Sequence, residues 1–110
     1  MIINRKDKVD IATVTFKRSG GFIGHGMKYV LNLDHLPTDD AKKLVRLIKK
    51  AEFFNLPENL IKKFMPDEYQ YTLTVDVGIT SHTVRTNDTT MPESLRPLVD
   101  ELSSLRPVLD

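Results

Sequence analysis

Three segments of this 110-residue chain alternate between apolar and polar side chains, and a fourth segment returns after the third, so that the four form two pairs, each joined by a glycine-containing connection. Such alternation is typical of strands that have one face in a core and the other in water. The first pair covers residues 11–17 and 27–34, and the second covers residues 69–77 and 79–86. We therefore expect two antiparallel hairpins, the first with a connection longer than the two-residue minimum.

Helical spacing of apolar residues occurs between and after these hairpins. The first helix is expected from Asp39 to Ala51, with Thr38 as its N-cap, two acidic residues in its first turn and two lysines in its last. Its apolar stripe consists of Ala41, Leu44, Val45, Ile48 and Ala51. The final helix begins near Arg96, because Pro97 suits a first turn, and its apolar positions are Leu98, Val99, Leu102 and Leu105.

A short third helix is expected from Glu58 to Phe64, before Pro66 and Asp67 turn the chain. The predicted fold class is α+β, an antiparallel sheet of about four strands, in two hairpins, packed on one face by two to three helices. We expect residues 11–106 to form a single domain, residues 1–10 to be a flexible N-terminal segment and residues 107–110 to be a tail.

Composition argues against several classes of partner and location. Sixteen Lys and Arg residues against fifteen Asp and Glu give a net charge of +1, so a nucleic-acid partner is not expected. The N-terminal residues contain no apolar signal-peptide core, and no apolar run is longer than three residues, so we expect a cytoplasmic protein with no membrane contact. The absence of cysteine is compatible with a reducing compartment and removes disulfides and thiol catalysis.

No set of residues in the sequence has the spacing of a catalytic or metal site. The three histidines, His25, His35 and His82, lack the paired helical spacing of a metal site, and His82 is expected to be a packed strand residue. Ser19 does not lie in a nucleophile elbow, since glycine and phenylalanine follow it. We expect no enzymatic activity, no catalytic residue, no bound metal and no cofactor.

Four of the five glycines, Gly20, Gly21, Gly24 and Gly26, surround the apolar pair of Phe22 and Ile23. A phosphate-binding loop would need a helix directly after it, whereas a strand is expected here. The backbone-clamping loop of KH modules has similar glycine spacing, but it joins helices and presents basic residues. Two readings stay open, an apolar tip tucked under the sheet and an exposed apolar anchor for a partner.

Several motifs are specific in their combined order and spacing rather than one by one. They are Arg18-Ser19-Gly20-Gly21-Phe22-x-Gly24, Ala51-Glu52-Phe53-Phe54-x-Leu56-Pro57, Tyr69-x-Tyr71-x-Leu73, His82-Thr83-Val84 and Pro92-x-x-Leu95-Arg96-Pro97-Leu98. Together they resemble the emfourin family, and the similarity extends from about Ile11 to Leu105. Two departures from the family pattern are the ten residues before Ile11 and Ile23, where a smaller residue is expected.

The resemblance implies a bacterial, cytoplasmic inhibitor of protealysin and related thermolysin-like zinc metallopeptidases. We expect it to be monomeric when free, and the sequence does not decide whether it leaves the cytoplasm with its target. Such enzymes favour bulky apolar side chains after the scissile bond, so the glycine-rich loop would occlude the cleft without covalent chemistry. The implied protease-binding residues are Arg18, Ser19, Gly20, Gly21, Phe22, Ile23, Gly24 and His25. The alternative is a non-enzymatic adaptor or regulatory domain with an apolar recognition loop or an exposed edge strand.

Overall fold

The computed structural model describes residues 11–20, 26–63 and 65–105, which form four strands, two α-helices and two short 3-10 helices. In chain order the elements are β1 (Ile11–Gly20), β2 (Met27–Asn32), η2 (Leu33–His35), α1 (Thr38–Lys50), η3 (Phe53–Asn55), β3 (Tyr69–Val77), β4 (Thr80–Asn87) and α2 (Arg96–Ser104). The α+β class and both hairpins are confirmed. Neither α-helix of the described chain is long and apolar enough to span a bilayer.

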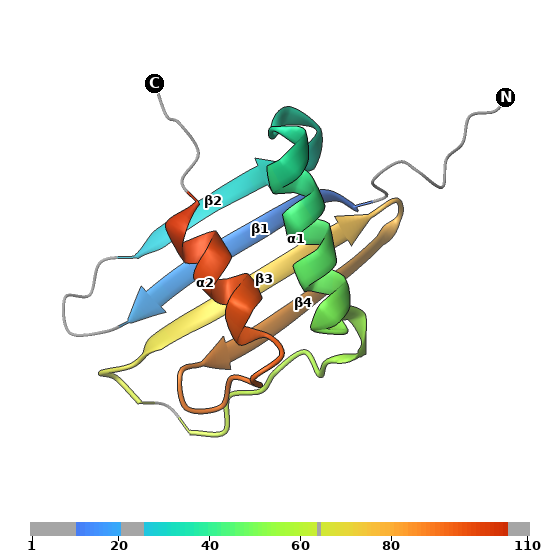
Figure 1. Ribbon diagram of the computed structural model, residues 1–110. Helices are drawn as coiled ribbons and strands as arrows, with labels where there is room; N and C mark the ends of the chain where they lie inside the picture. Colours follow the sequence, from blue (N-terminus) through green and yellow to red (C-terminus); the bar gives the residue numbers. More distant parts are fainter. Residues whose placement is uncertain (1–10, 21–25, 64, 106–110) are drawn as a thin grey trace, which may run out of the picture.

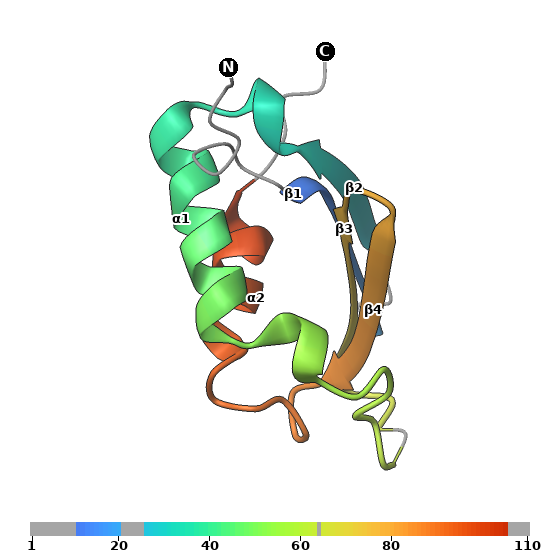
Figure 2. The ribbon, with the colours of Figure 1, turned by 90° about the vertical axis from the view of Figure 1, so that its right-hand side faces the viewer.

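The four strands form one open antiparallel sheet in the order β2-β1-β3-β4 (Figure 1). The two hairpins join through β1 and β3, so these two strands are central and β2 and β4 are the edges. Both α-helices lie on the same face of the sheet, which gives a two-layer molecule (Figure 2). The loop between β1 and β2 therefore leaves the sheet at the same end as the start of β3 and the end of β4.

The alternating side chains of the strands divide as the sequence predicts. The helix-covered face contributes most of the core, together with apolar residues of both helices; these core residues include Val14, Phe16, Leu44, Ile48, Leu73, Val75, Val84, Leu98 and Leu102. The other face is rich in threonine, where Thr74 and Thr83 share a hydrogen bond of 2.7 Å across β3 and β4. A hydrogen bond from the Tyr29 hydroxyl to the Leu102 carbonyl and an ion pair of 3.0 Å between Lys43 and Glu101 connect β2 to α2 and α1 to α2.

The predicted helix from Glu58 to Phe64 is wrong for its described residues, 58–63, and Phe64 itself lies outside the described residues. This segment is extended and pairs locally with β4. The backbone N–H of Leu60 donates to the carbonyl of Arg85 at 2.8 Å, and the N–H of Arg85 donates to the carbonyl of Glu58 at 2.8 Å. Pairing with a strand edge satisfies backbone groups that a helix would have satisfied internally.

Several element boundaries also differ from the prediction, and β4 and the end of α1 are each shifted by one residue. Pro37, not Thr38, is the N-cap of α1, because its carbonyl accepts the first helical bond, from Ala41 N–H at 3.0 Å. The second strand ends at Asn32, whose side chain accepts a bond from the N–H of Asp34 and so starts η2. The first strand continues beyond residue 17 to Gly20.

Candidate functional site

The end of the sheet where the glycine-rich segment begins is the candidate site. Of the eight residues implied to bind a protease, Arg18, Ser19 and Gly20 are the last three residues of β1. The other five, Gly21, Phe22, Ile23, Gly24 and His25, lie outside the described residues. What the structure describes is the stem of the loop, which consists of Arg18, Ser19 and Gly20 together with the residues of β2 and β3 that pair with them.

The stem is held from both sides. Arg18 lies opposite Met27 of β2 and opposite Tyr71 of β3, so the hairpin is attached to the third strand as well as closed on itself. Pairing between β1 and β3 continues through Ser19 to Gly20, which lies opposite Tyr69. A loop that starts from a central, doubly paired strand has a fixed point of departure, which lowers the entropy lost when a partner orders it.

Gly20 has a conformation and a neighbour that require glycine. Its φ is +89°, and a Cβ at this position would lie 2.7 Å from the carbonyl oxygen of Glu68. Glu68 is itself held by Thr89, whose backbone N–H donates to the Glu68 carboxylate at 3.0 Å and whose hydroxyl donates to the same carboxylate. The first residue of the glycine cluster is therefore explained by close backbone approach rather than by loop flexibility alone.

Arg18 lies over an aromatic ring beside this glycine. Its guanidinium carbon is 4.5 Å from the centroid of the Tyr69 ring, a cation–π distance. Its Nε is buried and makes no hydrogen bond with another described residue. The contact thus places a positive charge at the base of the loop.

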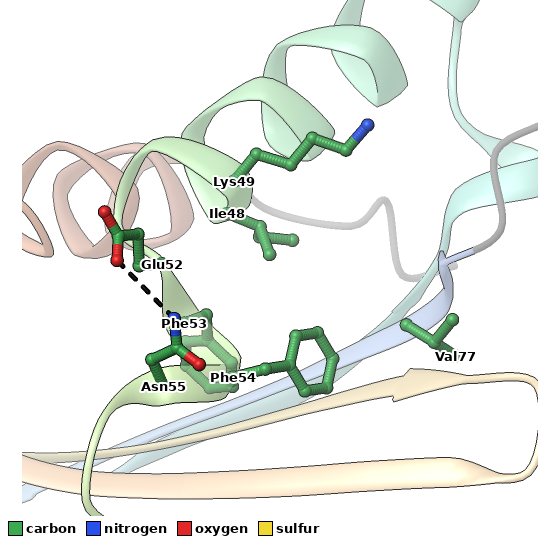
Figure 3. A pocket seen from close by; sticks show the side chains of 7 residues that line it. All are labelled: Ile48, Lys49, Glu52, Phe53, Phe54, Asn55 and Val77. Atoms are coloured by element: carbon green, nitrogen blue, oxygen red, sulfur yellow. Dashed lines mark hydrogen bonds between the residues drawn. The ribbon is translucent and has the colours of Figure 1, made fainter.

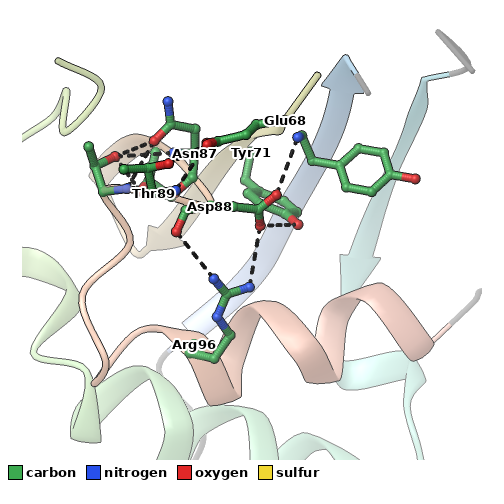
Figure 4. Close-up of polar contacts among 9 residues, drawn as sticks. Glu68, Tyr71, Asn87, Asp88, Thr89 and Arg96 are labelled. Carbon is green, nitrogen blue, oxygen red and sulfur yellow. Dashed lines mark hydrogen bonds and ion pairs between the residues drawn. The ribbon is translucent and has the colours of Figure 1, made fainter. Parts of the chain in front are cut away.

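Asp88, directly after β4, connects the start of β3 to α2 (Figure 4). One carboxylate oxygen accepts the Tyr71 hydroxyl at 3.0 Å, and the other accepts the N–H of Tyr69 at 3.3 Å. Arg96 contacts the first oxygen through Nη1 at 3.5 Å and donates to the Asp88 carbonyl through Nη2 at 3.4 Å. Burial, then the hydrogen bond and charge of Asp88, raise the pKa of Tyr71 to about 12, so this hydroxyl stays a donor at physiological pH.

Sequence reasoning missed this network. It assigns residues 87–90 no role and places Tyr69 and Tyr71 only in an alternating strand and in a family motif. An aspartate followed by two threonines after a strand is a signal for side-chain bonding to nearby backbone groups, but the distant partners depend on strand register.

The family comparison covers this end of the molecule. The family described as Emfourin matches residues 16–103, which include the whole stem, the segment between β1 and β2, and the Asp88 network. The chain belongs to the emfourin family. Membership implies a metallopeptidase-inhibitor role rather than an enzymatic one. Comparisons with curated proteins and with solved structures found no match.

At the opposite end of the sheet this emfourin has an open, mostly apolar pocket of about 400 Å³ (Figure 3). Its lining residues are Ile48, Lys49, Glu52, Phe53, Phe54, Asn55 and Val77. His82 lies next to it, with its ring centroid 5.6 Å from Phe53 and 5.9 Å from Phe54, and its Nε2 2.8 Å from the Leu56 carbonyl oxygen. His82 is therefore a packed strand residue, as the sequence predicts.

The described part of the chain contains no group of three or more His, Cys, Asp or Glu residues that could hold a metal ion. The acidic residues nearest to the stem have structural partners, since Glu68 binds Thr89 and Asp88 binds Tyr71 and Arg96. The chemistry of the candidate site is therefore hydrogen bonding and apolar contact around a fixed stem.

Proposed function

We propose that this emfourin inhibits a thermolysin-like zinc metallopeptidase of the protealysin type by non-covalent occlusion of its active-site cleft. The single observation that supports this most is the Emfourin match over residues 16–103, within which the segment from β1 to β2 starts from a doubly paired strand. Neither the target enzyme nor the mode of contact follows from family membership, so both belong to the proposal.

The proposed contact is the segment that begins at the end of β1. Phe22 and Ile23 are large apolar residues between glycines, and thermolysin-like enzymes favour such side chains just after the scissile bond. Glycines on both sides let the backbone come close to the walls of a cleft. An aromatic residue at the centre of an interface is the commonest type of hot spot.

The neighbouring residues have supporting roles in this proposal. Ser19 and His25 provide hydrogen-bonding groups at the rim, Gly20, Gly21 and Gly24 give the backbone its shape, and Arg18 adds a positive charge at the base. Inhibition then depends on a stem that is ordered before binding and on one or two apolar side chains that enter the cleft.

The test is a titration of protealysin activity with the purified protein, in which wild type should reduce peptide hydrolysis stoichiometrically. Phe22→Ala should weaken inhibition by about 2 kcal/mol or more, roughly thirtyfold, with little loss of stability. Ile79→Ala is the matched control, because Ile79 is fully exposed in the turn of the other hairpin, and this variant should inhibit like wild type.

Two results would contradict the loop mechanism in different ways. A stable Phe22→Ala variant that inhibits like wild type would move the contact to the N-terminal segment, residues 1–10. A loss of roughly 3–5 kcal/mol of stability in the same variant would mean that Phe22 is tucked into the core.

A binding role without protease inhibition is the second candidate, and the edge strand β2 favours it. β2 pairs only with β1 among the described strands, and Val30 on its outer face is 56% exposed. Such an edge can add an extended peptide as a further strand. Failure of wild type to inhibit protealysin or thermolysin at micromolar concentration would favour this candidate.

A further inference from the structure

Arg18 is the only arginine or lysine of the described strands on the helix-covered face of the sheet. Alternation along β1 puts it on the same side as Val14 and Phe16, both fully buried. Its neighbour Lys17 is exposed on the other face. A charged group at the margin of a core has a desolvation cost, which an opposite charge or hydrogen bonds normally offset.

No such compensation is found among the described residues. They contain two ion pairs, Lys43 with Glu101 and Arg96 with Asp88, and neither includes Arg18. Asp88 already accepts bonds from Tyr71, Tyr69 and Arg96. The buried Nε of Arg18 therefore has a donor with no acceptor in the described structure.

The Tyr69 ring holds the guanidinium in a defined place. The guanidinium carbon lies over the ring, 4.5 Å from its centroid. An arginine that stacks on an aromatic face keeps its in-plane N–H groups for another acceptor. Tyr69 is in turn fixed by its backbone bond to Asp88 and by its position opposite Gly20. The Arg18 side chain is thus already restricted in the free protein, so it loses less conformational entropy when a partner binds.

We propose that Arg18 is a pre-positioned carboxylate-binding group that recognises an Asp or Glu side chain of the inhibited peptidase. The proposal rests on the inhibitory function proposed above and names the chemistry of a second contact beside the apolar one. A carboxylate matches the planar, forked donors of arginine, and it would pair with a positive charge that neither ion pair of the described residues neutralises. Because Gly21 follows Gly20 directly, a partner that engages the loop also covers the base where Arg18 lies.

The first experiment compares three variants against protealysin at low and high salt. Arg18→Met, which keeps an unbranched stem but removes the charge, should raise the inhibition constant about tenfold or more and flatten its salt dependence. Arg18→Lys should recover only part of the loss, because an ammonium keeps the charge without the fork. Lys17→Met is the matched control, with the same charge change one residue away on the opposite face, and it should inhibit like wild type.

The second experiment observes the wild-type protein, and Arg18→Lys serves only to assign the signal. The side-chain Nε–Hε resonance of Arg18, which is absent in Arg18→Lys, should shift when protealysin is added, because a carboxylate would bind the same guanidinium. An unchanged resonance in the inhibited complex would overturn the proposal. So would equal losses in Lys17→Met and Arg18→Met, which would indicate a long-range charge effect, or a loss fully explained by a lower denaturation midpoint.

The outcomes separate this inference from the function on which it rests. Wild type that inhibits, loses inhibition with Phe22→Ala and keeps it with Arg18→Met refutes the carboxylate contact alone. Wild type that does not inhibit protealysin or thermolysin refutes the proposed function, and the carboxylate contact with it.

Discussion

At the level of single residues, two glycines with left-handed backbone have different reasons to be glycine. Gly20 has φ +89° with the Glu68 carbonyl oxygen 2.7 Å from where a Cβ would lie, whereas Gly78 has φ +58° with no atom within 4 Å of that place. A side chain at Gly78 is opposed only by the left-handed backbone conformation, while one at Gly20 would also clash with the backbone of Glu68, directly before β3.

We therefore expect Gly20→Ala to cost roughly 2 kcal/mol or more and Gly78→Ala about 1 kcal/mol, because strain from the left-handed conformation is common to both and the clash is not. Urea denaturation of both variants measures the difference. Gly20→Ala should also weaken inhibition at concentrations where it is folded, since the loop starts at this residue. Equal midpoints for the two variants would contradict the close approach to Glu68.

The raised pKa of Tyr71 should make the free energy of unfolding decrease at alkaline pH. Its pKa of about 12 in the folded protein lies above the ordinary tyrosine value of 10.0, chiefly through burial and then through Asp88. The unfolded state loses this proton first, so the contribution is fully present below pH 10 and is lost as pH rises towards 12. Urea titrations between pH 8 and 12 should show a shallower fall for Tyr71→Phe than for wild type.

The same variant should be less stable at neutral pH by about 1–2 kcal/mol, because a hydrogen bond to a carboxylate is lost. An identical alkaline slope in both proteins would show that another group is responsible for the fall in stability.

At the level of elements, α1 is attached to the sheet by one buried stripe. Leu44 is fully buried and Ile48 is 2% exposed, as the helical spacing predicts, while Arg46 faces solvent. We expect Leu44→Ala or Ile48→Ala to cost roughly 2–5 kcal/mol through the cavity each leaves, and the control Arg46→Ala to change stability by less than about 0.5 kcal/mol. A stable Leu44→Ala variant that no longer inhibits would make this face the interface and contradict its assignment to the core.

Both hairpins and both α-helices were predictable because each depends on the local spacing of apolar residues and on nearby turn and capping residues. The pairing of β1 with β3 was not, since it joins residues about sixty positions apart and follows from the packing of two hairpins. The structure of residues 58–63 was not predictable for the same reason. Their sequence favours a helix, but their backbone pairs instead with β4, which is distant in the sequence. Arg18 was found by its place in a motif, whereas its contact with Tyr69 required the register of three strands.

At the level of the whole molecule, one core connects every element to the sheet, and the two ends of that sheet differ. The glycine-rich connection, Arg18 and the Asp88 network are at one end, and the apolar pocket beside Phe54 is at the other. An inhibitor that uses the first end leaves the second free, so changes at Ile79 or Phe54 report on general effects of an apolar surface rather than on the cleft.

The final prediction is that this fold does not depend on a metal ion. Its core consists of apolar side chains from the sheet and both helices, and the described residues contain no cluster able to hold a metal. The melting temperature should therefore be the same with and without EDTA, measured by the ellipticity of the purified protein. A decrease of several degrees that zinc restores would contradict this, because metal binding would then contribute to folding. If the melting temperature is unchanged, any effect of a chelator on inhibition must come from the zinc of the peptidase, which makes the inhibitor's own stability a clean control for experiments on the complex.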